Sequence, residues 1–223
     1  MATPQSAQDK REAKRPAPRL YLVTPVIENA AAFAATLGGA LEVADFAAVL
    51  LRLKPAGERD LINRIKTLAS VVQRKDTALI LDGQAEIAAR AGADGAHLHG
   101  IEAFMAAVDG LKPARIAGCG GLKSRDDAMA AGERGADYVM FGDTAADGHR
   151  PSFGAIIERI EWWAELFTIP CVGFAGGPNE VSPIVTAGAD FIAVGDGIWD
   201  DPRGAAAALT AVAALLAAPE TAA

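Results

Sequence analysis

Two basic residues stand where a β-rich run of the sequence ends. Arg52 and Lys54 come directly after the apolar run Phe46–Leu51, two residues apart. Because side chains of an extended chain alternate between two faces, both cations are expected on one face. Two neighbouring cations in a chain of net charge −7 indicate a local site for an anion such as pyrophosphate. A strand end closed by salt bridges is the alternative.

Two carboxylates follow the next two β-rich runs. Asp82 comes after Thr77–Leu81, and Glu102 comes shortly after Gly95–Leu98. Carboxylates on neighbouring loops can hold one Mg²⁺ ion that also binds phosphate oxygens. We therefore predict Asp82 and Glu102 as magnesium ligands. A helix N-cap for Asp82 and a solvated acid in a first helical turn for Glu102 are the alternatives.

The three histidines differ in their expected surroundings. His99 stands at the end of its run, where it could contact a substrate. His97 lies inside the same run and is expected to be packed and hydrogen-bonded. His149 lies in a polar loop and is expected to be exposed.

Glycines follow the last two β-rich runs, in Ala175-Gly176-Gly177 and Gly195-Asp196-Gly197. Glycine lets the main chain approach an anion closely, and bare backbone N–H groups can then bind a phosphate. Asp196 opposes such binding unless its carboxylate points away or caps a helix. Two tight turns without a ligand are the alternative.

Eight short apolar runs alternate with alanine-rich stretches. Most of the runs are nearly continuous, as strands buried on both faces are, which predicts a parallel sheet covered by helices. Eight such units favour a closed (β/α)8 TIM barrel, whose functional residues gather at the carboxyl ends of the strands. An open doubly wound sheet is disfavoured, because no GxGxxG follows the first run. The predicted strands are Leu20–Thr24, Phe46–Leu51, Thr77–Leu81, Gly95–Leu98, Arg115–Cys119, Tyr138–Phe141, Cys171–Phe174 and Phe191–Val194.

Local signals mark where several helices begin and end. Ser124 is a predicted N-cap followed by two acids, and Asp201 is a predicted N-cap before Pro202 at the first helical position. Gly-Ala-Asp recurs at residues 92, 135 and 188, where each glycine is expected to end a helix. The predicted helices are Leu61–Val72, Gly83–Ala91, Ser124–Gly132, Phe153–Leu166, Asn179–Ala187 and Gly204–Ala217.

Composition bounds the class of protein. Of the 223 residues, 51% are hydrophobic and 22% are charged, which excludes disorder for most of the chain. The negative net charge argues against binding to nucleic acid or to an anionic membrane, and no apolar run approaches the roughly 20 residues that span a bilayer. Residues 1–18 are expected to be a disordered tail, and residues 19–218 a single barrel domain. Without a CxxC pair, Cys119 and Cys171 are expected to be reduced, buried thiols of a cytoplasmic protein.

Several of these stretches also carry a family pattern: Leu20–Thr24, Arg52-x-Lys54, Asp82, Gly92–Leu98, Gly135–Gly142 and Gly188–Val194. Their order along about Leu20–Ile198 resembles the thiamine phosphate synthase family, whose sister thiazole tautomerases share much of the pattern. The resemblance implies a (β/α)8 barrel, a homodimer, Mg²⁺ and small phosphorylated metabolites as ligands. It also implies a reaction that couples a hydroxymethylpyrimidine diphosphate to a thiazole phosphate and releases pyrophosphate.

The resemblance assigns roles by position. Arg52 and Lys54 would bind the pyrophosphate, Asp82 and Glu102 would hold Mg²⁺, and Arg150 would supply the charge of a loop lysine. The backbone that would hold the thiazole phosphate belongs to Ala175, Gly176, Val194 and Gly195.

Other positions depart from the family pattern. Polar groups of the family are replaced by Leu50, Leu81, Gly120 and Asp196, and HLGQ reads His97-Leu98-His99-Gly100. The tautomerase histidine is Leu122 here. The sequence therefore predicts a divergent thiamine phosphate synthase. The alternatives are a paralogue that binds a phosphorylated thiazole-like metabolite without this chemistry, and a related isomerase in which His99 moves the proton.

Overall fold

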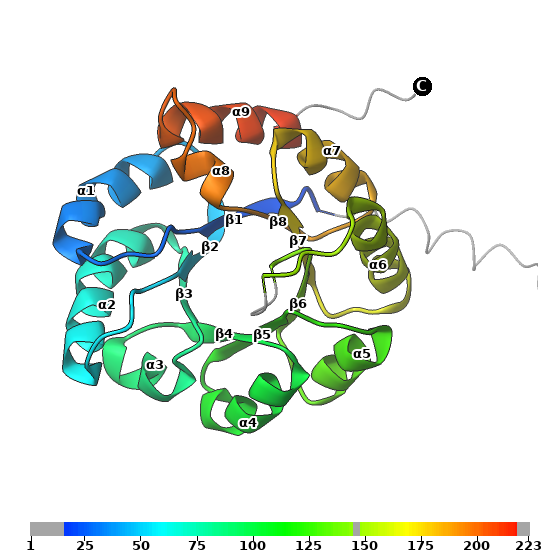
Figure 1. Cartoon of the computed structure of the whole chain (residues 1–223), viewed down its shortest axis with the longest axis horizontal. Helices are drawn as coiled ribbons and strands as arrows, with labels where there is room; N and C mark the ends of the chain where they lie inside the picture. The colour runs from blue at the N-terminus through cyan, green and yellow to red at the C-terminus, as the bar shows by residue number, and fades with distance from the viewer. Residues whose placement is uncertain (1–15, 145–147, 218–223) are drawn as a thin grey trace, which may run out of the picture.

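Eight parallel strands close into a barrel with helices around it in the computed structural model, which describes residues 16–144 and 148–217 (Figure 1). The strands follow one another around the barrel in chain order, and β1 pairs with both β2 and β8. The predicted (β/α)8 fold is therefore confirmed. The strands are β1 (Arg19–Val23), β2 (Phe46–Leu51), β3 (Ala78–Asp82), β4 (Gly95–His99), β5 (Ile116–Gly120), β6 (Tyr138–Phe141), β7 (Cys171–Ala175) and β8 (Phe191–Val194).

The helices lie outside the barrel and follow the strands along the chain, with two of them after β8 (Figure 1). They are α1 (Ala30–Leu41), α2 (Glu58–Val72), α3 (Ala85–Ala91), α4 (Ile101–Leu111), α5 (Arg125–Glu133), α6 (Phe153–Leu166), α7 (Pro178–Thr186), α8 (Asp196–Trp199) and α9 (Ala205–Ala217), with the 3-10 helix η1 at Gln73–Lys75.

Both faces of the strands are buried, which explains why the apolar runs are nearly continuous. In β1, Leu20 and Leu22 belong to the core between strands and helices, whereas Tyr21 and Val23 belong to the core inside the barrel. The alternation follows the period of two of an extended chain. At a strand end, this period decides which side chains reach the barrel mouth.

Helix α5 begins as its sequence predicts. The Ser124 hydroxyl accepts a hydrogen bond from the Asp127 backbone N–H at 3.0 Å, and the Asp127 carboxylate accepts one from the Ser124 N–H at 3.1 Å. This capping box satisfies two of the free N–H groups at the helix start.

The three Gly-Ala-Asp turns share one hydrogen-bonding device. Each glycine has a positive φ, as the predicted helix ends require. The carboxylates of Asp94, Asp137 and Asp190 accept hydrogen bonds of 2.7–2.8 Å from backbone N–H groups of β3, of β5 and at the start of β7. Each aspartate therefore ties its turn to the preceding strand, at the end of the barrel away from the predicted site.

The last helix agrees with its predicted range of residues 204–217 to within one residue, but its predicted N-cap is wrong. Helix α9 begins at Ala205, and Asp201 with Pro202 lies in the turn before it. The Asp201 carboxylate accepts hydrogen bonds from the Arg203 backbone N–H and guanidinium instead of capping a helix that starts at Pro202. Gly204 has a φ of +88°, which is not helical, so α9 can begin only after it.

Three further expectations concern the cysteines, membrane-spanning helices and the N-terminal tail. Cys119 and Cys171 are buried and form no disulfide, as predicted, and burial raises the pKa of the Cys119 thiol to about 12. No helix in residues 16–144 and 148–217 is long and apolar enough to cross a bilayer. Most of the predicted tail, residues 1–15, lies outside the described residues.

Candidate active site

A cavity of about 470 Å³ opens at the carboxyl ends of the strands, where a barrel of this kind carries its functional residues. Its lining combines charged groups with a few apolar side chains. The lining residues are Val23, Leu50, Arg52, Asp82, His97, His99, Met140, Asp143, Thr144, Arg150, Phe174, Ala175, Gly176, Asp196 and Gly197.

Arg52 directly follows β2. It comes two residues after Leu50, whose side chain points into the barrel, so its own side chain points to the same side. Its backbone N–H donates to the Thr24 hydroxyl at 3.0 Å, and its Nε–H donates to the Thr24 carbonyl oxygen. The remaining fork of the guanidinium forms an ion pair with Asp196. Arg52 is therefore held by the end of β1 while its charged tip faces the cavity.

His99 lies between two carboxylates. Its Nε2 is 2.6 Å from Oδ1 of Asp82, and its Nδ1 is 3.4 Å from Oδ2 of Asp143. The carboxylates of Asp143 and Asp82 raise the pKa of His99 to about 10. Burial alone would raise the pKa of Asp82, but the bound imidazole outweighs burial and lowers it.

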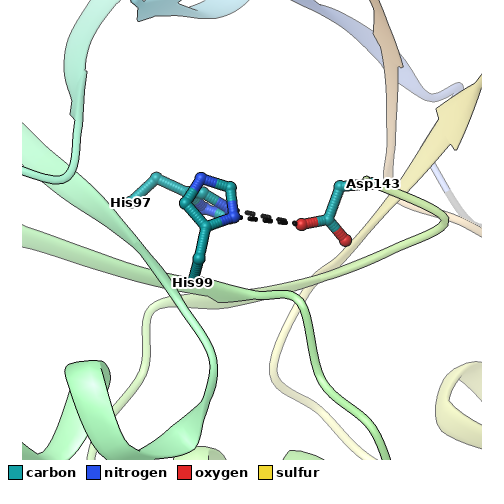
Figure 2. Close-up of side chains that lie close together, drawn as sticks. All are labelled: His97, His99 and Asp143. Carbon is teal, nitrogen blue, oxygen red and sulfur yellow. Dashed lines mark ion pairs between the residues drawn. The ribbon is translucent and has the colours of Figure 1, made fainter. Parts of the chain in front are cut away.

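Asp143 is the most buried acid of the cavity. Its Oδ2 accepts a hydrogen bond from the Gly121 N–H at 2.8 Å and lies 3.9 Å from Nε2 of His97. Burial alone would raise the pKa of Asp143, but the imidazoles of His97 and His99 lower it to about 2. Figure 2 shows both rings pointing toward this carboxylate, which comes from the loop after β6.

Two tyrosines inside the barrel form a chain of hydrogen bonds with His97. Nδ1 of His97 lies 3.1 Å from the Tyr138 hydroxyl, which lies 2.7 Å from the hydroxyl of Tyr21. His97 is fully buried, as the sequence predicts, and the rings of His97 and Tyr138 are stacked. Burial raises the pKa of both tyrosines, so they remain neutral donors and acceptors.

Arg150 is fixed at the other side of the cavity by four hydrogen bonds. Its guanidinium donates to the carbonyl oxygens of Gly142 and Phe174 at 2.9 and 3.1 Å, and to the Glu180 carboxylate at 3.1 and 2.6 Å. Glu180 also accepts from the Gly176 N–H at 2.7 Å. Arg150 thereby joins the loops after β6 and β7, and its charge is balanced by Glu180.

The predicted site residues fall into two groups. Arg52, Asp82, His99 and Arg150 all line the cavity. Lys54 and Glu102 do not. The Lys54 side chain is 55% exposed and pairs with Glu28 at 2.9 Å, and Glu102 is exposed on the first turn of α4.

The loops after β7 and β8 form a smaller hollow of about 30 Å³. It is lined by all four residues predicted to hold a phosphate: Ala175, Gly176, Val194 and Gly195. Asp196, which opposes an anion there, begins α8 and pairs with Arg52. Arg203, which also lines the hollow, is bound to Asp201.

Two functional candidates are missing from the sequence predictions. Asp143 stands alone after the strand in a Gly-Asp-Thr turn, and Glu180 is an ordinary first-turn acid of α7, so the sequence singles out neither. The charged side chains that they contact, His99 and Arg150, lie at least 30 residues away in the chain. The signal for Asp143 is its position two residues after a predicted strand.

The chain is similar to known proteins over most of its length. The family model described as thiamine monophosphate synthase matches residues 20–198. The thiamine-phosphate synthase of Rhodospirillum centenum is 42% identical over 194 residues, which cover 86% of this chain and 94% of that protein. The thiamine-phosphate synthase of Hyphomonas neptunium is 37% identical over 214 residues, covering 90% of this chain and 95% of the relative.

Solved structures share the fold. The thiamine phosphate pyrophosphorylase of Pyrococcus furiosus superposes with a TM-score of 0.72 at 23% identity, over 89% of this chain and 95% of the other. The 3-hexulose-6-phosphate synthase of Salmonella typhimurium gives a TM-score of 0.68 at 15% identity, over 89% and 98%. These likenesses concern the barrel alone. From the sequence matches it follows, as predicted, that this chain belongs to the thiamine monophosphate synthase family.

Proposed function

We propose that this protein is a thiamine phosphate synthase, which joins a hydroxymethylpyrimidine diphosphate to a thiazole phosphate and releases pyrophosphate. One observation carries the proposal: in a member of this family, Arg52 faces a cavity of about 470 Å³ at the barrel mouth. The same cavity reaches the glycines after β7 and β8, where a second phosphorylated substrate could be bound by backbone N–H groups.

Arg52 is suited to the leaving diphosphate. In a dissociative transfer the leaving group gains negative charge early, so stabilising that charge matters more than a strong base. The partner of Arg52, Asp196, has a side chain that is 66% exposed, whereas that of Arg52 is only 24% exposed. Asp196 can therefore swing into water and free a guanidinium fork that fits phosphate oxygens.

The acids of the cavity would repel the diphosphate unless a further cation is bound. Three acids, Asp82, Asp143 and Asp196, line it together with the cations Arg52, His99 and Arg150. Arg150 is already neutralised by Glu180, so the acids outnumber the remaining cations. Carboxylates repel a diphosphate at short range in a poorly solvated site. An added cation would offset this repulsion.

Magnesium is the cation that the resemblance implies, held by Asp82 and Glu102. Glu102 is exposed on α4 and outside the cavity lining, while Asp82 is bound to His99. The residues present therefore do not fit a two-carboxylate magnesium site. Arg52, His99 and the backbone of the β7 and β8 loops remain the groups of this chain that can bind and orient the substrates.

The assembly and the setting belong to the same proposal. We expect a homodimer with small phosphorylated metabolites as its ligands, as the resemblance implies, and a cytoplasmic location, as the cysteine content of the sequence indicates. Light scattering of the purified protein tests the dimer, and a monomer at all concentrations would contradict it.

The reaction is tested by mixing the purified protein with both substrates and a divalent metal salt, and measuring thiamine phosphate by mass spectrometry. We expect thiamine phosphate and pyrophosphate in equal amounts. Saturable binding of the thiazole phosphate in a calorimeter, without product, would favour the alternative of a binding paralogue.

A further inference from the structure

His97, His99 and Asp143 form a compact cluster of metal-ligating side chains on the wall of the cavity. One ligand atom from each lies within 4.8 Å of the others. Two of the side chains come from β4, two residues apart on its inner face, and the third comes from the loop after β6 (Figure 2). All three line the cavity.

The nitrogens that face the cluster lack hydrogen bonds. In the part of the chain that the structure describes, neither Nε2 of His97 nor Nδ1 of His99 has a hydrogen-bond partner, although both atoms are buried. They lie 3.9 and 3.4 Å from the same oxygen, Oδ2 of Asp143. An unsatisfied buried polar atom destabilises the fold, so two nitrogens aimed at one carboxylate call for a ligand between them.

The opposite sides of the three groups are fixed. Nδ1 of His97 contacts the Tyr138 hydroxyl at 3.1 Å, and Nε2 of His99 contacts Asp82 at 2.6 Å. The Asp143 carboxylate is held by the Gly121 N–H at 2.8 Å. Ligands of protein-bound metals are typically oriented in this way, by a carboxylate or another polar group on the second ring nitrogen.

We propose that His97, His99 and Asp143 bind one divalent transition-metal ion, with zinc as the representative. Two imidazoles and one carboxylate suit zinc or its neighbours, whereas magnesium prefers oxygen ligands alone. In a tetrahedral zinc site the ligand atoms are about 3.3–3.5 Å apart. The distance from His99 to Asp143 already fits, and that from His97 to Asp143 must shorten by about half an ångström. The two imidazole nitrogens, which lie within 4.8 Å of each other, must also come to this spacing.

This site differs from the predicted magnesium pair in every ligand. Asp82 becomes the group that orients His99, and Glu102 has no part in it. The ion would also supply the positive charge that the acids of the cavity require. Binding of the ion does not depend on the proposed reaction, so each can be tested without the other.

The rival arrangement keeps the cluster free of metal. In it, a doubly protonated His99 bridges the carboxylates of Asp82 and Asp143. Both arrangements use the same residues, and stoichiometric metal binding distinguishes them.

The test uses the full chain without a histidine tag, treated with a chelator and then titrated with Zn²⁺ in a calorimeter and with Co²⁺ in a spectrophotometer. We expect one equivalent of Zn²⁺ to bind and Co²⁺ to give visible absorption bands of a nitrogen- and oxygen-ligated site. His99→Gln and Asp143→Asn should each weaken Zn²⁺ binding by at least 100-fold. His149→Gln, which changes the remaining histidine of the chain, is the matched control and should bind like the wild type.

Circular dichroism shows which variants fold. If Asp143→Asn does not fold, His99→Gln, whose side chain is partly exposed, decides the matter. The proposal is overturned if the wild type binds no stoichiometric ion, or if folded His99→Gln binds Zn²⁺ as tightly as the wild type. A protein that binds Zn²⁺ yet makes no thiamine phosphate would retain this site and lose the proposed reaction.

Discussion

Nε2 of His99 lies 2.6 Å from Oδ1 of Asp82, so the aspartate at the end of β3 is bound to the histidine at the end of β4. The strands are neighbours in the barrel, and both side chains stand on its inner face. Asp82 thereby turns Nδ1 of His99 toward Asp143. Asp82, which the sequence predicts to be a metal ligand, therefore positions His99.

Asp82→Asn should therefore weaken the proposed zinc site without abolishing it. The amide can still contact His99 but does not enhance its basicity, and loss of such outer partners typically costs about 10- to 100-fold in metal affinity. Calorimetric titration with Zn²⁺ measures the effect, with Asp60→Asn on the surface of α2 as the control. An unchanged Kd in Asp82→Asn would show that Asp82 does not orient the ligand.

Arg52→Gln should lower kcat/KM by roughly 10- to 150-fold, since a hydrogen bond to a charged group is worth about 1.5–3 kcal/mol. Arg59→Gln removes an exposed arginine of α2 and is the matched control. A steady-state assay of pyrophosphate release measures both. Equal activity in the two variants would remove Arg52 from the diphosphate site.

Lys54→Gln should reduce kcat/KM far less than Arg52→Gln. The strand ends at Leu51, and Leu53 forms a β-bridge with Ile27, which carries Lys54 to the surface beside Glu28. An exposed pair of this kind contributes at most about 1 kcal/mol. The same assay applies, and a loss as large as that of Arg52→Gln would support the role in pyrophosphate binding that the sequence predicts.

Gly120→Ala should damage the cavity. A Cβ atom at Gly120 would lie 2.5 Å from Nε2 of His97 and 2.6 Å from Oδ2 of Asp143, so the cluster must move apart. Overpacking of this kind costs about 1–3 kcal/mol, and the metal affinity should fall with it. The free energy of unfolding in urea and the Kd for Zn²⁺ measure the two effects.

Gly110→Ala is the control for that variant. It lies near the end of α4 with nothing within 4 Å of its Cβ position, so alanine should be neutral or stabilise by up to about 1 kcal/mol. Wild-type stability and Zn²⁺ affinity in Gly120→Ala would mean that His97 and Asp143 are not packed against this glycine.

Glu180→Gln should make stability less sensitive to acid. Burial alone would raise the pKa of Glu180, but the hydrogen bonds from Arg150 lower it below its ordinary value of 4.5. A depressed pKa stabilises the fold above the unfolded value, and this stability is lost as pH falls through the lower folded value. Urea unfolding at pH 7 and at about pH 3 should show a smaller difference for Glu180→Gln than for the wild type. Glu165→Gln, exposed on α6, should behave as the wild type, and a wild-type pH dependence in Glu180→Gln would contradict the assignment.

The fold was predictable because each strand is buried on both faces and therefore reads as an apolar run. The helices were harder to predict than the strands. Helix α1 has a Gly38-Gly39 pair, and α4 starts from Gly100 without a side-chain cap, so neither was predicted. The missed signal for α1 is Asn29, whose side chain accepts a hydrogen bond from the Ala32 N–H.

Site residues could be predicted only where the alternation of side chains along a strand fixes their direction. Asp82 ends β3 and Arg52 follows β2 directly, so the alternation places both at the mouth. Lys54 and Glu102 lie beyond strand ends, where the alternation no longer holds. The approach of Asp143 to His99 joins residues 44 positions apart, and no local pattern reports it.

The central claim is tested most directly by a single-turnover experiment, with the protein in excess over hydroxymethylpyrimidine diphosphate and with saturating thiazole phosphate. Rapid quenching followed by mass spectrometry should show pyrophosphate and thiamine phosphate appearing at one rate and in equal amounts, slowed in Arg52→Gln and unchanged in Arg59→Gln. A diphosphate that stays intact, or that loses pyrophosphate to water without forming thiamine phosphate, would contradict the account.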